Sequence, residues 1–383
     1  MTKLEELIQK LCPNGVEHKP LNEVSEMKRG TSITKKDIVE GEIPVVSGGR
    51  EPAYYCDKYN RDGETITVAG SGAGAGYVQY WTKPIFVCDA FSIQGNPGIQ
   101  MKYIYYFLTN IQDYIYSTKK GGGVPHVHIS SIENVSVPVP PLPVQREIVR
   151  ILDNFTELTA ELTAELTARK KQYAYYRDKL LSTNNSSVPV VELRDIVKKS
   201  CSGATPAKGN AEYYENGTIP WIRTQDVRFN EITEVNSYIT EKAVSETATK
   251  WIPENCVIVA ISGATAGRCA INKIKATTNQ HCLNLIIDDS MALYRYVFHC
   301  LCSKYEELIS RKQGARGDLN SSLILSLPIP IPSLEVQKRL VKVLDNFDAI
   351  CSDLKIGLPA EIEARQKQYE YYRDKLLTFT PAD

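Results

Sequence analysis

Two glycine-rich segments have the composition of loops that approach a phosphate group. Ser71-Gly-Ala-Gly-Ala-Gly76 follows the apolar stretch 65–69, and Ser262-Gly-Ala-Thr-Ala-Gly267 follows the apolar stretch 257–261. Glycine lets the backbone come close to a phosphate, and a serine hydroxyl can contact phosphate oxygens. Neither segment has the GxGxxG register, and no Lys-Ser or Lys-Thr follows as a P-loop requires. Both segments are therefore candidates for phosphate contact and not for a nucleotide site.

Basic, hydroxyl and amide side chains accompany these segments, and such groups contact the phosphates and base edges of DNA. We predict from them a DNA-binding set, although any one member could equally be an ordinary solvated side chain. In the first half of the chain the set is Lys28, Arg29, Ser47, Arg50, Ser71, Lys119, Lys120, His126 and His128. In the second half it is Arg223, Thr224, Gln225, Ser262, Arg268, Gln280, His281, Arg311, Lys312 and Arg316.

The side chains that could bind a metal or act in catalysis lack the neighbouring residues that such chemistry requires. His126 and His128 have no nearby acidic or cysteine residue at metal-ligand spacing, so the two are either solvated or contact DNA. The chain has no Asn-Pro-Pro-Tyr sequence, the usual signature of amino-methyltransferases, and no GxSxG elbow. We therefore predict no catalytic residue, no metal site and no cofactor bound by this chain.

Composition narrows the class of protein. The formal net charge is zero, which counts against a stand-alone nucleic-acid binder but allows one whose partners share the phosphate contacts. The ten cysteines include no CxxC pair, so we expect reduced, buried thiols in a cytoplasmic protein. The sequence begins without a signal-peptide core, and no apolar run is long enough to span a membrane.

A long segment occurs twice in the chain. Residues 138–155 match residues 330–347 at an offset of 192, and residues 168–181 match residues 364–377 at an offset of 196. Each copy begins with alternating prolines, which stop the preceding element before a helix begins. Ser333 is the candidate N-cap of the second helix.

Apolar residues then recur at intervals of four and three, which predicts a heptad seam. In the two copies the seam residues are Val144, Ile148, Ile151, Phe155, Leu158 and Leu162, and Val336, Leu340, Val343, Phe347, Ile350 and Leu354. We expect the two helices to pack antiparallel on each other. The alternative is that each helix covers the core of its own domain.

The change of offset between the copies has a local cause. Thr159-Ala-Glu-Leu162 is repeated at once by Thr163-Ala-Glu-Leu166, whereas the second copy has Gly357-Leu-Pro359 at the matching place. Glycine and proline together predict a break there, with Pro359 near a new helix start. One four-residue unit adds about 6 Å and a net rotation of about 40° to a helix.

The segments outside the helices match each other more weakly. Each glycine-rich segment is flanked by two strand-like stretches, which predicts a hairpin, and a short helix begins near Tyr103 in one half and Tyr294 in the other. We predict an α+β fold in which two α/β domains lie at opposite ends of an antiparallel pair of long helices, as a pseudo-two-fold internal repeat. The expected domains are 1–140, 141–183, 184–330 and 331–383. The segment 4–11 is expected to lie beside the end of the second helix.

This layout resembles the specificity subunit of type I restriction–modification systems. The resemblance covers nearly the whole chain and is most specific in four segments and one repeat. These are 138–148, Ile151-Leu-Asp-Asn-Phe155, the Thr-Ala-Glu-Leu units, Gln172-Tyr-Ala-Tyr-Tyr-Arg-Asp-Lys-Leu-Leu181 with its second copy, and Gly121-Gly-Gly-Val-Pro-His126.

The resemblance implies that 1–140 and 184–330 are target-recognition domains, each for half of a split sequence in double-stranded DNA. It implies that the chain is not an enzyme, and that it directs two methyltransferase subunits and restriction subunits. Those partners would use S-adenosylmethionine for adenine N6 methylation, and ATP and magnesium for cleavage. The implied methyltransferase-docking residues are Gln145, Arg146, Tyr173, Tyr176, Arg177, Gln337, Arg339, Tyr369, Tyr372 and Arg373. The implied spacer residues are Leu158, Leu162, Leu166, Gly357 and Pro359. The alternatives are a degenerate methyltransferase and a coiled-coil scaffold that binds only protein.

Overall fold

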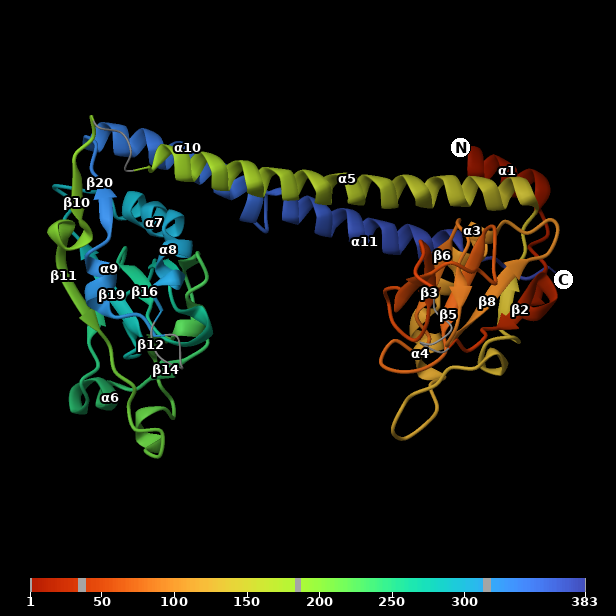
Figure 1. The fold of residues 1–383 in the computed structure, drawn as a ribbon, viewed down its shortest axis with the longest axis horizontal. Coiled ribbons are helices and arrows are strands. Elements are labelled where there is room, and N and C mark those ends of the chain that lie inside the picture. Colours follow the sequence, from red (N-terminus) through yellow and green to blue (C-terminus); the bar gives the residue numbers. More distant parts are fainter. Residues whose placement is uncertain (1, 34–38, 183–186, 313–317, 383) are drawn as a thin grey trace. The chain divides into compact units, whose positions relative to one another are not determined.

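The computed structural model describes residues 2–33, 39–182, 187–312 and 318–382. The chain divides into two compact units. The first unit comprises residues 1–163 and 361–383, and the second comprises residues 164–360. Both units combine helices with mixed sheets, so the predicted α+β class is confirmed (Figure 1).

The first unit contains a four-stranded antiparallel sheet of order β2-β8-β5-β6 and a three-stranded sheet of order β4-β3-β7. Its strands are β1 (His18–Pro20), β2 (Ser25–Arg29), β3 (Ile43–Val46), β4 (Tyr54–Cys56), β5 (Thr65–Ala69), β6 (Val78–Trp81), β7 (Phe86–Val87), β8 (Ala90–Gly95) and β9 (Ser136–Pro138). Its helices are α1 (Lys3–Leu11), α2 (Leu21–Val24), α3 (Met101–Asn110), α4 (Gln112–Ser117), the first part of α5 (Leu142–Leu180) and most of α11 (Leu358–Leu376), with a 3-10 turn at Ile129–Ser131.

The second unit contains a five-stranded sheet of order β11-β19-β16-β17-β13 and a four-stranded sheet of order β14-β12-β18-β15. Its strands are β10 (Val190–Glu192), β11 (Val197–Ser202), β12 (Ile219–Ile222), β13 (Glu231–Ile232), β14 (Tyr238–Ile239), β15 (Trp251–Ile252), β16 (Val257–Ala260), β17 (Cys269–Asn272), β18 (Ala276–Thr278), β19 (Cys282–Ile287) and β20 (Pro328–Pro330). Its helices are α6 (Glu241–Glu246), α7 (Tyr294–Ser303), α8 (Tyr305–Ser310), α9 (Ser321–Leu325), α10 (Leu334–Ser352) and the last part of α5. Its 3-10 turns are Leu193–Ile196, Ala211–Tyr213, Thr224–Asp226 and Gly263–Thr265.

The two units repeat the same local frame. The predicted hairpins are confirmed as β5–β6 and β16–β17, and the predicted short helices as α3 and α7. In each unit a buried tyrosine connects the short helix, α3 or α7, to the proline-rich strand that precedes the long helix. The Tyr103 hydroxyl donates to the carbonyl oxygen of Pro138 (3.0 Å), and the Tyr296 hydroxyl donates to that of Pro330 (2.8 Å).

Two predictions about the helices that follow these strands are confirmed: the N-cap of the second helix and the break within it. Helix α5 runs without a break for 39 residues. Helix α10 begins after Ser333, whose side chain accepts a hydrogen bond from the backbone N–H of Val336. It ends at Ser352, and α11 starts at Leu358 with Pro359 as its second residue, so the predicted break is confirmed. Asp353 stabilises the break, because its Oδ1 accepts hydrogen bonds from the backbone N–H groups of Lys355 and Ile356.

Each unit joins helical segments from both copies of the repeat. In the first unit α5 packs against α11, and the rings of Phe155 and Tyr372 stack with centroids 5.5 Å apart. In the second unit the last part of α5 packs against α10, and the rings of Tyr176 and Phe347 stack at 6.2 Å. The repeated tyrosine motif therefore belongs to a different unit from the domain that precedes it in the chain.

The predicted heptad seam is wrong for several residues. Val144 and Ile148 are buried in the core of the first unit, together with strands and α3, because the first turns of α5 cover that domain. Val336, Val343 and Ile350 are 41%, 44% and 44% exposed, and Leu354 is 74% exposed. The two interpretations of the helices thus apply to different parts of the same helix: its start covers a domain core, and its later turns contact the other helix.

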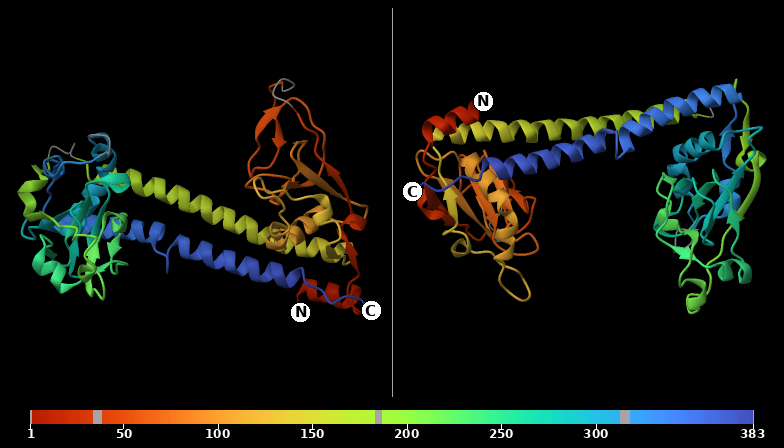
Figure 2. Two further views of the ribbon diagram at one scale, coloured as in Figure 1. Left: turned by 90° about the horizontal axis from the view of Figure 1, so that it is seen from below. Right: turned by 180° about the vertical axis from the view of Figure 1, so that it is seen from behind.

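The N-terminal helix lies where the sequence analysis places it, beside the end of α11. Val16 forms a parallel bridge with Pro381, and the buried residues Leu4 and Leu377 share one core (Figure 2). Glu147 on α5 fixes α1, because its carboxylate accepts a hydrogen bond from Lys3 Nζ at 2.8 Å. Hydrogen bonds from Arg150 and Lys3 lower the pKa of Glu147 to about 2.

In both units a glycine packs directly against the backbone of another segment, and we call this contact a glycine crossing. Gly30 follows β2 and lies close to Cys88, the residue directly after β7. A Cβ on Gly30 would overlap the carbonyl oxygen of Cys88. Gly203, which follows β11, lies in the same way against the carbonyl oxygen of Thr278. The next residue donates a backbone hydrogen bond in each case, from Thr31 to Val87 (2.9 Å) and from Ala204 to Thr278 (3.0 Å). A side chain at either glycine would separate two backbone segments.

We predict that Gly203→Ala destabilises the second unit by about 2 kcal/mol, because the added methyl group must displace the carbonyl of Thr278. Calorimetry of the full chain should show a loss of several degrees in the unfolding temperature. Gly209→Ala is the matched control, since a Cβ there would meet no atom within 4 Å. Equal unfolding temperatures for the two variants would contradict the prediction.

Candidate nucleic-acid interface

Five loops of the first unit converge, and we call them the first loop cluster: residues 28–31, 47–50, 70–76, 88–90 and 119–128. Backbone hydrogen bonds join them, because Gly70 N–H donates to the carbonyl oxygen of Asp89 (3.0 Å) and Gly72 N–H to that of Pro125 (3.0 Å). A Cβ on Gly48 would overlap the carbonyl oxygen of Ser71, so these loops also touch directly. The glycines of this segment therefore allow loops to pack together.

All nine of the predicted DNA-binding residues of the first half lie in this cluster. Ser47 and Arg50 precede and follow the Gly48 crossing, and the Arg50 guanidinium lies over the Tyr77 ring at 5.1 Å. Lys120 and His126 exchange backbone hydrogen bonds of 2.9 and 2.8 Å, which shape the tip of the loop 119–128.

The remaining predicted residues of the first half differ in how free their side chains are. The His126 and His128 rings stack, with centroids 6.0 Å apart. The Lys119 ammonium lies 4.2 Å from the centroid of a tyrosine ring. Arg29 is exposed next to the Gly30 crossing, whereas the Lys28 ammonium is paired with Glu26 at 2.8 Å. Lys28 is therefore the member of the cluster whose charge is neutralised within the chain.

The second loop cluster comprises residues 203–205, 223–226, 261–267, 279–281 and 319. It is joined as the first is: Ile261 N–H donates to the carbonyl oxygen of His281 (2.9 Å), and Leu319 N–H donates to that of Ile261 (2.8 Å). The Gln280 side chain accepts a hydrogen bond from the Thr205 hydroxyl and lies 3.2 Å from the His281 ring nitrogen. Gln280 and His281, both predicted, are therefore held side by side.

A 3-10 turn carries three further predicted residues, Arg223, Thr224 and Gln225. Asp226 orders this turn by accepting a hydrogen bond from the backbone N–H of Arg223 at 2.8 Å. The Nε atom of Arg223 is buried and has no hydrogen-bond partner among the described residues. The Arg223 guanidinium lies over the Trp221 ring, 5.9 Å from its centroid.

Other predicted residues of the second half are less favourably placed. Ser262 and Arg268 flank the turn between β16 and β17 and lie in the cluster or directly beside it. Arg311 forms an ion pair with Glu307 on α8, so its charge is partly neutralised within the unit. Lys312 follows it at the edge of the described segment, and Arg316 lies outside the described residues.

Sequence analysis missed four residues of the two clusters. Gly30 and Gly203 make the crossings, and Asp89 and Asn279 lie in the turns that follow β7 and β18. The predicted set consists of basic, amide and hydroxyl side chains near glycine-rich segments, so it does not include an isolated aspartate. Aligning the two halves strand by strand would have found both turns.

Two predicted docking residues require correction. Gln145 and Gln337 are 1% and 0% exposed and bond inside their own units. Gln145 Oε1 accepts from the Gln100 backbone N–H at 2.9 Å, and Gln337 Oε1 accepts from that of Leu293 at 2.9 Å. Their amide groups donate to backbone carbonyl oxygens of the proline-rich segments. The two glutamines therefore connect the start of each long helix to its domain and do not present a docking surface.

The other predicted docking residues fall into two groups. Those that contact their own unit are Tyr173, Tyr176, Arg177, Tyr369, Tyr372 and Arg373. Arg146 and Arg339 are exposed, and within the part of the chain that the structure describes neither forms a hydrogen bond or ion pair with the other helix. Arg339 pairs with Glu335 on its own helix. At the offset of 192 the counterpart of Arg146 is Lys338, and Arg339 is the next residue along the second copy.

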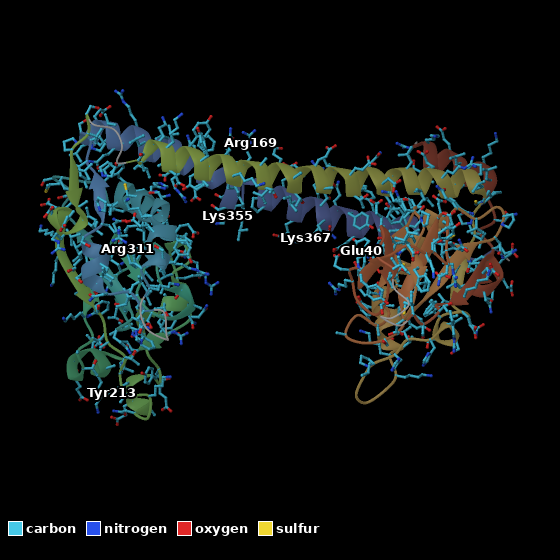
Figure 3. The ribbon with its side chains drawn as sticks, viewed as in Figure 1. Glu40, Arg169, Tyr213, Arg311, Lys355 and Lys367 are labelled. Carbon is cyan, nitrogen blue, oxygen red and sulfur yellow. The ribbon has the colours of Figure 1, made fainter. Side chains whose placement is uncertain are left out.

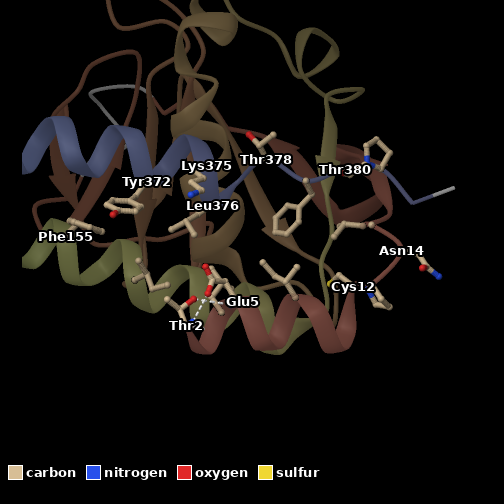
Figure 4. Close-up of a pocket in the computed structure, with 18 of the residues that line it drawn as sticks. Thr2, Glu5, Cys12, Asn14, Phe155, Tyr372, Lys375, Leu376, Thr378 and Thr380 are labelled. Atoms are coloured by element: carbon tan, nitrogen blue, oxygen red, sulfur yellow. Dashed lines mark hydrogen bonds between the residues drawn. The ribbon is translucent and has the colours of Figure 1, made fainter.

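A cavity in the first unit is lined by residues outside the loop cluster. It has a volume of about 990 Å³ and is lined by α1, α5, α11 and the C-terminal segment (Figure 4). Phe155, Tyr372 and Leu376 give it an apolar wall, and its one carboxylate, on Glu5, is bonded to Thr2. Among the described residues no group of three His, Cys, Asp or Glu side chains could hold a metal ion. In the same residues no helix is long and apolar enough to cross a membrane.

Comparison with known proteins agrees with this duplicated architecture. The family model described as type I restriction modification DNA specificity domain matches residues 13–169 and 185–364. The specificity subunit of the type I restriction enzyme EcoR124I/EcoR124II from Escherichia coli is 39% identical over 292 residues, which cover 73% of this chain and 71% of that protein. A putative type I specificity subunit from Haemophilus influenzae is 29% identical over 401 residues and covers 99% of both chains.

Solved structures share the fold at low sequence identity. The type I restriction–modification S subunit from M. genitalium superposes with a TM-score of 0.60 at 17% identity, covering 94% of this chain and 96% of that one. A chain from a study of assembly and conformational transition of the type I R-M system gives a TM-score of 0.66 at 17% identity, covering 95% and 98%. With two matched regions and two loop clusters on one repeated frame, the chain belongs to the type I restriction–modification DNA specificity family and is a specificity subunit, not an enzyme.

Proposed function

We propose that this chain recognises a bipartite sequence in double-stranded DNA, one half-site through each loop cluster. The observation that carries the proposal is that the two clusters contain equivalent backbone hydrogen bonds but different side chains. Ile261 N–H to His281 repeats Gly70 N–H to Asp89, yet the side chains at these turns are unrelated. A repeated frame with different exposed side chains suits two surfaces that bind different base sequences.

The charge balance supports an assembly in which other subunits share the phosphate contacts. Phosphate neutralisation dominates DNA affinity, and a chain with 45 basic and 45 acidic residues supplies little net attraction. We infer that two methyltransferase subunits and the restriction subunits complete the binding surface. S-adenosylmethionine, ATP and magnesium would be used by those subunits, for adenine N6 methylation and for cleavage. The ten free cysteines support a cytoplasmic location.

The direct test is to co-express the chain with a type I methyltransferase subunit in a host that lacks adenine methylation. Sequencing of methylated adenines should reveal a single split target. We expect variants in 47–128 to change one half-site and variants in 203–281 to change the other. Adenine methylation without a common split sequence would contradict the proposed function, as would a target in one continuous block.

We propose that Arg146 and Arg339 bind the methyltransferase subunits, one at each copy of the repeat. Reversal of both charges, Arg146→Glu with Arg339→Glu, should weaken subunit association about tenfold or more, because each reversal replaces attraction by repulsion. Analytical ultracentrifugation of the mixed subunits measures this.

Arg169→Glu is the matched control for the docking variants. Arg169 is exposed on α5 (Figure 3). It pairs with Glu165 on its own helix, as Arg339 pairs with Glu335. If the control weakens assembly as much as the double variant does, the effect is one of general charge and the assigned docking residues are wrong.

We further propose that the Thr-Ala-Glu-Leu units of α5 set the length of the DNA that is not recognised between the half-sites. Leu158, Leu162 and Leu166 are spaced by four and half-buried, so removal of one unit preserves their stripe. Four residues correspond to about 6 Å and about 40° of net rotation, and one base pair to about 3.4 Å and about 35°.

Deletion of residues 163–166 should therefore shorten the unrecognised spacer by about one base pair and leave both half-sites unchanged. Sequencing of methylated adenines measures both properties in one experiment. Substitution of the same four residues by Ser-Ala-Gln-Leu keeps the length and serves as control. Altered half-sites, or an unchanged spacer after the deletion, would refute the role of this segment as a ruler.

A further inference from the structure

An acidic side chain lies inside the first loop cluster. Asp89 is exposed in the turn between β7 and β8. Its Oδ2 accepts a hydrogen bond from the Ser71 hydroxyl, and its Oδ1 lies against Gly70, where a Cβ would come within 3.2 Å of it. Among the described residues Asp89 has no ion pair, and its Oδ1 has no hydrogen bond. The carboxylate is thus fixed in position and keeps one oxygen unused.

The same turn in the second unit carries two predicted DNA-binding residues. Cys88 N–H donates to Val46 (2.8 Å), and Asn279 N–H donates to Ile222 (3.0 Å), so both turns leave the neighbouring strand at the same point. The ends of the two turns are also equivalent. The carbonyl oxygen of Asp89 accepts a hydrogen bond from Gly70 N–H, as that of His281 accepts one from Ile261 N–H. The second turn is one residue longer and presents Gln280 and His281. The fold therefore places Asp89 where the other unit has an amide and an imidazole.

A carboxylate at such a place is unfavourable for binding DNA through phosphates, because the two negative charges repel each other. Its chemistry suits a base edge instead. An ionised carboxylate only accepts hydrogen bonds. In the major groove cytosine presents the N4 amino donor, whereas guanine presents two acceptors and thymine an acceptor and a methyl group. Adenine presents a donor beside the N7 acceptor, which suits an amide such as Gln280 better than a carboxylate.

Resting on the proposed function, we propose that Asp89 is a specificity-determining residue. It accepts a hydrogen bond from the N4 amino group of a cytosine in the half-site bound by the first unit. Ser71 acts as a positioning residue, because its hydroxyl occupies Oδ2 and leaves Oδ1 for the base. Gly70 leaves room for the carboxylate, since a side chain there would crowd Oδ1.

The variant Asp89→Asn separates this role from a merely structural one. The asparagine carbonyl oxygen can still accept the Ser71 hydrogen bond, so a structural link between the loops would be kept. The amide NH₂ would then face the cytosine amino group, and donor would meet donor. We expect the preference for cytosine at one position of one half-site to fall about 10- to 100-fold, with the other half-site unchanged.

The experiment uses the chain assembled with its methyltransferase partner. The split target of the wild-type complex is determined first, by sequencing methylated adenines. Binding is then measured on duplexes in which each cytosine of the half-sites is replaced in turn by 2-pyrimidinone, which lacks the 4-amino group. At one position the wild-type complex should lose about tenfold or more in affinity. The Asp89→Asn complex should bind the 2-pyrimidinone duplex at least as well as the cytosine duplex, because the contact between two donors is removed.

Two further variants keep the test decisive. Asp57→Asn removes the same charge from an exposed aspartate of the first unit outside the cluster, and it should leave every base preference unchanged. Ser71→Ala retains the carboxylate and loses its positioning bond, so the cytosine preference should weaken several-fold. Thermal unfolding of all three variants confirms that the frame is intact.

Three results would overturn the assignment: half-sites that contain no cytosine on either strand, an unchanged cytosine preference in Asp89→Asn, or an equal change in affinity for all sequences. Each of these leaves bipartite recognition standing. Failure of the wild-type complex to direct methylation to a split sequence would instead contradict the proposed function.

Discussion

The structure depends on a long helix, α5, whose two ends contribute side chains to different hydrophobic cores. The first turns of α5 bury Val144, Ile148 and Leu152 completely in the first unit, and Leu181, just beyond its end, is buried in the second. Each such side chain contributes about 1.5–3 kcal/mol when it leaves water. Because α5 is continuous over 39 residues, a single helix contributes side chains to the core of each unit.

Buried polar groups determine how each domain is joined to its helix. Gln145 and Gln337 satisfy a backbone N–H of the domain and a carbonyl of the proline-rich entry at the same time. A buried amide must find such partners, since an unmade bond costs about 1–3 kcal/mol. The two glutamines therefore favour one entry geometry for the helix, and the same geometry recurs in both units.

On this fixed frame the loop clusters can differ without loss of the fold. The crossings at Gly30 and Gly203 and the bonds from Gly70 and Ile261 are made by backbone atoms. Side chains in the turns, such as Asp89 or Gln280, add little to the cores and are free to vary. This division between a backbone frame and exposed side chains gives a physical basis for two surfaces that bind different sequences.

The sequence by itself determined the duplication, the family, the hairpins, the N-cap at Ser333 and the break near Pro359. These features are local: proline removes a backbone donor, serine caps a helix, and repeated residues align without knowledge of the fold. Periodicity also predicted that the helices pair. It did not predict that Val336, Val343 and Ile350 are exposed, because a heptad pattern does not state which partner covers each turn.

Only the tertiary structure decided which helical segment belongs to which unit, and which loop residues meet. The stack of Tyr176 on Phe347 joins positions 171 residues apart, and the bond between Ser71 and Asp89 joins the β5–β6 turn to the turn between β7 and β8. Burial converted Gln145 and Gln337 from expected docking groups into internal connectors. Such contacts depend on the packing of segments distant in the chain, and residue type and spacing alone do not specify that packing.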